Sequence, residues 1–93
     1  MVQLSIDCGD IAPELRQHCL MVAGAILKAA GVTPESVCEA RRALLVADGS
    51  ESRARLTAAE ADALAAFNLA ELSARAESGR GEMCRLLLVE RLH

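Results

Sequence analysis

The side chains best able to do chemistry in this chain are four cysteines and two histidines. A structural zinc site needs four such ligands, usually in pairs roughly two to four residues apart, because one turn must present two of them to the same ion. No two cysteines here stand that close together. His18 and Cys19 are neighbours, but adjacent residues on a helix point about 100° apart and chelate poorly. We therefore expect no metal site and no cofactor.

The four cysteines are expected to be free thiols. The chain begins without the basic start and apolar run of a signal peptide, so we predict a cytoplasmic location, where reductants keep thiols reduced. Cys19 and Cys38 fall within predicted helices and should behave as small buried hydrophobes. Cys8 and Cys84 lie near the ends of elements and are the candidate reactive thiols. Disulfide bonding is the weaker alternative for these residues.

Nucleophilic catalysis would require a cysteine or serine held beside a base. Cys8, His18 and either Asp7 or Asp10 are close in the sequence, but nothing in their spacing brings them together. A glycine-rich phosphate loop is absent, and a short chain has little room for a water-excluding pocket. We therefore expect a protein that is not an enzyme and has no small-molecule substrate.

Composition and charge narrow the class of protein further. The chain has 93 residues and a net charge of −3, which argues against nucleic acid and anionic membranes as partners. Its longest apolar run, Cys19 to Leu27, is well short of the roughly 20 residues of a membrane span. Phe67 is the only aromatic residue, so the core must be built from aliphatic residues and alanine, which favours helices. We predict one helical domain, residues 1–93.

Local signals predict where these helices begin and end. Pro13 suits the first turn of a helix that continues to about residue 30, where Gly31 is a natural C-terminal cap. Its second half, residues 20–27, is apolar on every side and is expected to be buried all round. Thr33 and Pro34 then start a second helix to about Ala47, followed by a polar loop through residue 55.

The third helix has the clearest signal in the chain. Thr57 and Glu60 have the spacing of a capping box, and the helix that they open should reach about Glu77. Its apolar stripe, at spacings of three and four, is Ala61, Leu64, Ala65, Leu69, Leu72 and Ala76.

The two ends of the chain leave the fold class open. Val2, Leu4 and Ile6 alternate with polar residues, as in a short half-buried strand. The last segment, residues 82–93, suits a helix better, although its apolar run at 86–89 could also be a buried strand. We therefore predict an all-α fold, a small bundle of three to four helices with at most a short terminal strand pair. The alternative is an α+β fold in which residues 2–6 pair with 84–90.

One segment resembles a known DNA-binding motif. Residues 28–37, with Gly31 at the turn and Thr33 before the next helix, are similar to the turn of the helix-turn-helix of bacterial regulators. The resemblance implies a small DNA-binding regulator that uses Arg41 and Arg42 at backbone phosphates. Glu35 departs from the pattern because it would place a carboxylate against DNA, and the acidic chain departs from it as well.

We therefore expect a non-enzymatic protein-interaction module, with an adaptor, chaperone-like or regulatory role, that acts through a helical apolar surface. Its partner would be a second copy in a homodimer, or another protein. DNA binding is the alternative, and a thiol- or metal-binding small protein is the second alternative. The residues expected to form the interface or the core are Leu20, Val22, Ile26, Leu27, Leu64, Leu69 and Leu72.

Overall fold

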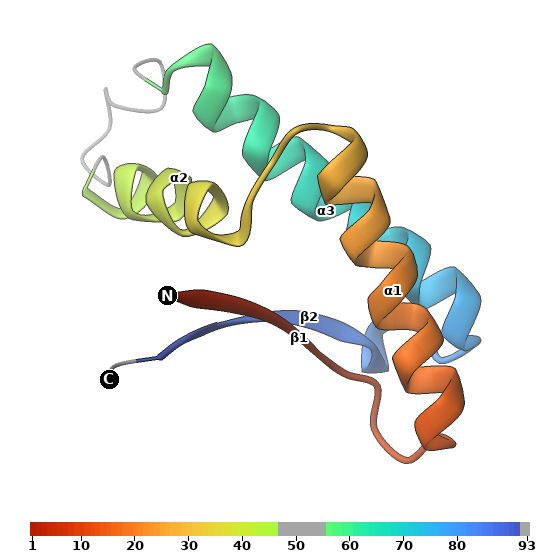
Figure 1. Cartoon of the computed structure of the whole chain (residues 1–93). Coiled ribbons are helices and arrows are strands. Elements are labelled where there is room, and N and C mark those ends of the chain that lie inside the picture. The colour runs from red at the N-terminus through yellow and green to blue at the C-terminus, as the bar shows by residue number, and fades with distance from the viewer. Residues whose placement is uncertain (47–55, 92–93) are drawn as a thin grey trace.

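The computed structural model describes residues 1–46 and 56–91, and the predicted end of the second helix near Ala47 and the loop after it lie outside these residues. Within the described ranges the chain forms three α-helices and one antiparallel pair of strands (Figure 1). In chain order the elements are β1 (Val2–Asp7), α1 (Pro13–Ala29), α2 (Pro34–Val46), α3 (Ala58–Ser78), the short 3-10 helix η2 (Gly81–Met83) and β2 (Arg85–Glu90).

The fold is a mixture of helices and a two-stranded sheet, so the all-α prediction is wrong for the ends of the chain and the α+β alternative describes them. β1 pairs with β2 in a register that runs from Val2 opposite Glu90 to Asp7 opposite Arg85. The predicted helix over residues 82–93 is replaced by η2 and β2. The physical reason is long-range: in this register Leu4 lies opposite Leu88 and Ile6 lies opposite Leu86, so these four apolar side chains share the face that packs against the core.

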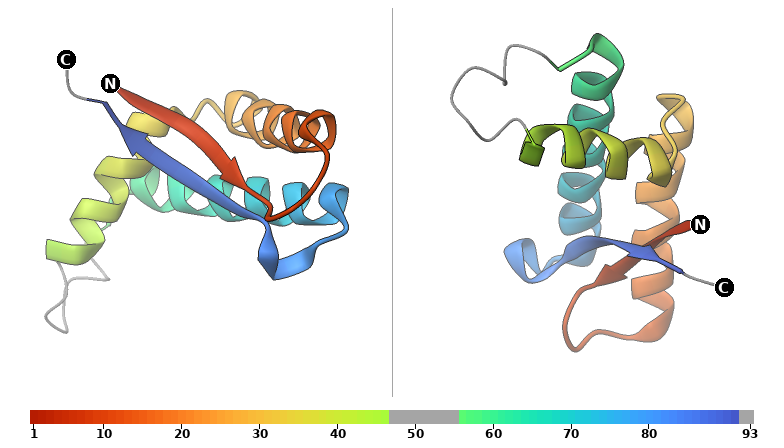
Figure 2. Two further views of the ribbon diagram at one scale, coloured as in Figure 1. Left: turned by 90° about the horizontal axis from the view of Figure 1, so that it is seen from below. Right: turned by 90° about the vertical axis from the view of Figure 1, so that its left-hand side faces the viewer.

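The helices form a layer on one face of the sheet. α1 and α3 lie side by side and run in opposite directions, and the sheet passes beneath them (Figures 1 and 2). α2 lies across the end of the sheet that holds both chain termini. There, Glu35 accepts a hydrogen bond from the Val2 N–H at 3.3 Å, and Arg42 pairs with Glu90 on the other strand.

The hydrogen bonding of the ladder fixes which backbone groups face outward. The N–H of Arg91 donates to the Met1 carbonyl at 2.9 Å, and hydrogen-bonded and non-hydrogen-bonded pairs alternate in an antiparallel ladder. Val2, Leu4 and Ile6 therefore belong to non-hydrogen-bonded pairs, so their N–H and C=O groups point away from β2. The bond from the Val2 N–H to α2 agrees with this alternation.

The predicted helix boundaries near Pro13, Gly31 and Pro34 are confirmed. Gly31 has a φ of 70°, a left-handed conformation that glycine adopts without strain, and it separates α1 from α2. The capping box at the start of α3 is present in both directions, with Thr57 accepting from the Glu60 N–H and Glu60 accepting from the Thr57 N–H.

The buried face of α3 differs from the predicted stripe. Its core side chains are small apart from Phe67, and Leu69 and Leu72 face solvent with 56% and 59% of their surface exposed. The prediction failed because both faces of this helix are apolar, and periodicity alone favours the face with the larger residues. In the structure the alanine-rich face is buried instead, because small side chains allow α1 and α3 to approach closely. The residues of α3 that face the core are Ala63, Ala66, Phe67, Ala70 and Ala74.

The second half of α1 is not buried all round, contrary to the sequence prediction. Cys19, Ala23 and Leu27 form its buried face. Met21 is 67% exposed and Ala25 is exposed as well. α1 packs mainly against α3 and β1, and these two elements do not cover all of its apolar residues, so part of the helix remains at the surface.

Candidate functional site

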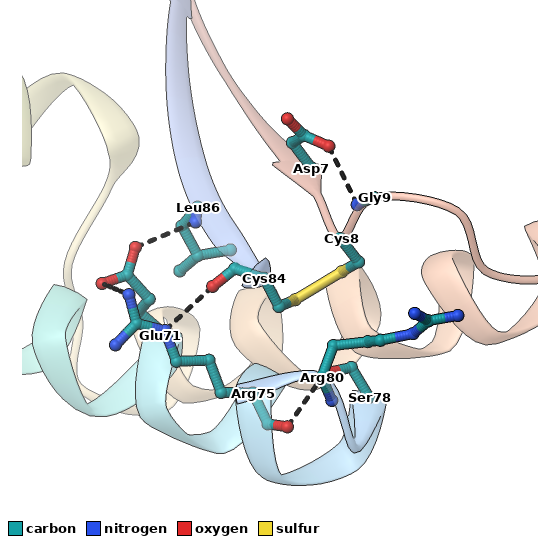
Figure 3. The surroundings of a disulfide bond; sticks show 9 residues. All are labelled: Asp7, Cys8, Gly9, Glu71, Arg75, Ser78, Arg80, Cys84 and Leu86. Carbon is teal, nitrogen blue, oxygen red and sulfur yellow. Dashed lines mark hydrogen bonds and ion pairs between the residues drawn. A yellow bond between two sulfur atoms is a disulfide. The ribbon is translucent and has the colours of Figure 1, made fainter. Parts of the chain in front are cut away.

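The two candidate reactive thiols are joined to each other. Cys8 and Cys84 form a disulfide bond directly beyond the last paired residues of β1 and β2 (Figure 3). The register places them opposite one another in a non-hydrogen-bonded position, where side chains of an antiparallel pair come closest. Both residues are buried, with 0% and 1% of their surface exposed. This bond contradicts the prediction that they are free, reactive thiols.

The disulfide also changes the argument about location. Disulfides persist mainly in oxidising compartments, so these two residues no longer support a reducing environment. The cytoplasmic location stays a prediction.

The outer edge of β2 is tied to α3 beside the disulfide. Glu71 accepts a hydrogen bond from the Leu86 N–H at 3.0 Å, and the Arg75 Nε donates to the Cys84 carbonyl at 2.9 Å (Figure 3). Glu71 and Arg75 also pair with each other at 3.4 Å. One turn of α3 thus hydrogen-bonds to an N–H group and to a carbonyl group that point outward from β2 and from the residue before it.

The remaining cysteines and His18 do not assemble a reactive centre. Cys19 is fully buried, and this burial raises the pKa of its thiol, with the charge of Glu77 adding to the effect. His18 lies at the surface, 3.5 Å from Glu77. Cys38 is a partly exposed free thiol on α2. Among the residues that the structure describes, no three His, Cys, Asp or Glu side chains lie together as metal ligands would.

The residues predicted to form the interface or the core divide into three groups. Leu27 is buried in the core, 2% exposed. Leu69 and Leu72 lie on the outer face of α3. The other four are partly buried, and all of them except Val22 pack against the core, namely Leu20, Val22, Ile26 and Leu64.

The outer face of α3 is a candidate interaction surface. Its residues are the predicted stripe without Leu64, and we call them the α3 outer stripe. All of them are exposed, and none carries a charge. They are Ala61, Ala65, Leu69, Leu72 and Ala76.

An apolar pocket between β1 and the C-terminal half of α1 was not predicted from the sequence. It has a volume of about 440 Å³ and is bounded by Leu4 of β1, Leu27 of α1 and the turn from Gly31 to Pro34. Among the described residues that line it, Lys28 is the one that carries a charge. A signal in the sequence was Gly24, a residue without a side chain in the middle of an apolar helix, which leaves open space at the wall of the pocket.

The two arginines expected at DNA phosphates have partners within the chain. The guanidinium of Arg41 lies 4.5 Å from the centre of the Phe67 ring, and Arg42 pairs with Glu90. Both contacts hold α2 against the rest of the fold. The DNA-binding alternative stays a prediction, and these contacts do not favour it.

In the described ranges, no single helix has both the length and the apolar character to cross a membrane. Among these residues, one pair of consecutive helices, α1 and α2, has the required length and composition when taken together, but the pair is bent by 77° at the break between them. We compared the chain with protein-family models, with curated proteins and with solved structures, and none of them matches it.

Proposed function

We propose that this chain is a non-enzymatic protein-interaction module that forms a homodimer through the α3 outer stripe. The observation that supports the proposal is the exposure of Leu69 and Leu72, at 56% and 59%, on a helix whose opposite face already serves the core. Burying an exposed leucine fully stabilises an association by about 1.5–3 kcal/mol, and an isolated exposed leucine is ordinary. A stripe of five apolar residues along one helix face is less ordinary.

The spacing of the stripe suits a second copy of the same helix. In an antiparallel pair related by a two-fold axis, Ala61 lies opposite Ala76 of the other copy, and Ala65 lies opposite Leu72. Leu69 then lies beside the axis. A large side chain thus faces a small one on both sides of the centre, which allows the two helices to pack closely.

The size of the stripe predicts how tight this dimer is. From Ala61 to Ala76 the stripe is about 22 Å long, at about 1.5 Å per residue, and one helix diameter, about 10 Å, wide. Such a strip is smaller than the roughly 800 Å² per partner of a standard stable interface, so the dimer belongs to the weak class. We expect a dissociation constant of about 100 μM or weaker.

Sedimentation equilibrium over a range of protein concentrations tests the proposal. The wild-type chain should show a monomer–dimer equilibrium, and Leu69→Glu should be a monomer at every concentration, because it places two carboxylates beside the two-fold axis. Leu87→Glu is the matched control, since Leu87 is also an exposed leucine, 41% exposed, but lies in β2. A wild-type chain that stays monomeric, or a Leu69→Glu variant that dimerises as well as the control, would refute the proposal.

A further inference from the structure

The pocket beside β1 has the size and lining of a ligand site. Its volume of about 440 Å³ lies within the range of about 300–1,000 Å³ that is typical of pockets for small ligands. Leu4, Leu27 and Val32 give it apolar walls. Apart from its chain neighbours and the backbone of its own helix, no heavy atom lies within 4 Å of the place where a Cβ on Gly24 would be, so an entering side chain meets open space there. An aliphatic side chain can therefore be buried in it without displacing a residue of the protein.

The strand that borders this pocket has a free edge. Leu4 lines the pocket with its side chain, and the alternation of the ladder directs its N–H and C=O away from β2. In the part of the chain that the structure describes, β1 pairs with β2 alone. Glu35 already occupies the outward N–H of Val2, so the space for a further strand begins at Leu4. An exposed strand edge next to apolar pockets is the arrangement by which proteins add an extended peptide to a sheet.

The charge at the pocket indicates which part of a peptide fits. Lys28 is exposed at its lining and forms no ion pair among the described residues. It is also the only lysine in a chain whose net charge is −3. An ammonium group beside an apolar pocket complements a carboxylate next to an aliphatic side chain. The C-terminal residue of a peptide combines these two groups.

We propose that this pocket binds the C-terminal residues of an extended peptide from another protein. The last aliphatic side chain fills the pocket between Leu4 and Gly24, the terminal carboxylate pairs with Lys28, and the peptide backbone hydrogen-bonds to the outer edge of β1 at Leu4. This site lies apart from the α3 outer stripe, so it does not depend on the dimer.

Fluorescence polarisation with a defined probe tests the site. The probe is a fluorescein-labelled hexapeptide of alternating threonine and valine that ends in leucine with a free carboxylate. It should bind the wild-type chain with a dissociation constant of about 1 mM or less, and 1 mM is the weak end of specific association. The same peptide with an amidated C-terminus should bind up to about fivefold more weakly, the effect of losing one exposed ion pair. Heteronuclear NMR should show shifts at the backbone amides of Leu4, Gly24 and Lys28.

Two variants with matched controls make the result specific. Gly24→Leu fills the pocket and should abolish binding, whereas Ala25→Leu adds the same side chain one position along on the exposed face and should leave binding unchanged. Lys28→Gln should bind the free peptide as weakly as the wild-type chain binds the amide, with Arg16→Gln as the surface control on the same helix.

Three outcomes would overturn the proposal. One is the absence of binding or of shifts at these amides, and another is equal binding by Gly24→Leu and Ala25→Leu. The third is binding of octanoate at this site without binding of the peptide, which would assign the pocket to a small carboxylate.

Discussion

Removal of the disulfide between Cys8 and Cys84 should cost this chain a large part of its stability. The bond joins residues 76 positions apart, and closing a loop of that length removes about 15 cal/mol/K of entropy from the unfolded chain, or about 4.5 kcal/mol at about 25 °C. Domains of this length are stable by about 5–14 kcal/mol in total. The native fold would therefore lose a third or more of its free energy of unfolding.

Urea denaturation followed by circular dichroism measures this loss. For a slope of about 1.5 kcal/mol per molar urea, a loss of about 4.5 kcal/mol lowers the midpoint by about 3 M. The oxidised chain should be compared with the same chain in excess dithiothreitol and with a double variant, Cys8→Ala and Cys84→Ala. Cys38→Ala is the control, because Cys38 is a free thiol away from the bond and its loss should shift the midpoint little.

Two results would refute this reasoning. If the midpoint of the reduced chain equals that of the oxidised chain, the cross-link does not restrict the unfolded state as assumed. If alkylation of the unfolded, non-reduced protein modifies four thiols rather than two, the bond is not formed in the protein as isolated.

Two further predictions follow from single side chains. Hydrogen bonds to the Glu35 carboxylate from its own backbone N–H and from the Val2 N–H lower its pKa, so its contribution to stability is present above the ordinary pKa and is lost as the pH falls through the lowered value. NMR titration of Glu35 should give a midpoint below that of free glutamate, and a midpoint at or above the free value would contradict the assignment. In the Glu35→Gln variant, the free energy of unfolding should fall less steeply as the pH is lowered through this range. Burial raises the pKa of the Cys19 thiol, and the charge of Glu77 adds to this, so iodoacetamide should modify the partly exposed Cys38 first, as peptide mapping can measure. Equal rates at the two cysteines would contradict the burial of Cys19.

The sequence predicted the features that depend on a few neighbouring residues. The proline starts of α1 and α2, the glycine between them and the capping box of Thr57 and Glu60 are each local, because one or two side chains satisfy the free backbone groups of a helix end. These signals located the helices within a few residues.

The sequence left open or did not predict the features that depend on distant partners. Residues 86–89 have an apolar run that suits a helix or a strand, and only pairing with β1, more than seventy residues away, decides between them. The disulfide depends on the same pairing, since Cys8 and Cys84 become neighbours only in that register. The pocket depends on where β1 lies against Gly24, which no local pattern in the sequence encodes.

Each edge of the sheet is blocked at one position by a carboxylate from a helix, and the two positions lie at opposite ends of the sheet. Glu35 accepts from Val2 on β1, and Glu71 accepts from Leu86 on β2. A stack of molecules joined edge to edge, as in a fibril, would need continuous hydrogen bonding along both edges and would have to displace both carboxylates in every molecule. The two helices thus block one position on each edge of the sheet, and a strand that added to either edge would have to begin beyond that position.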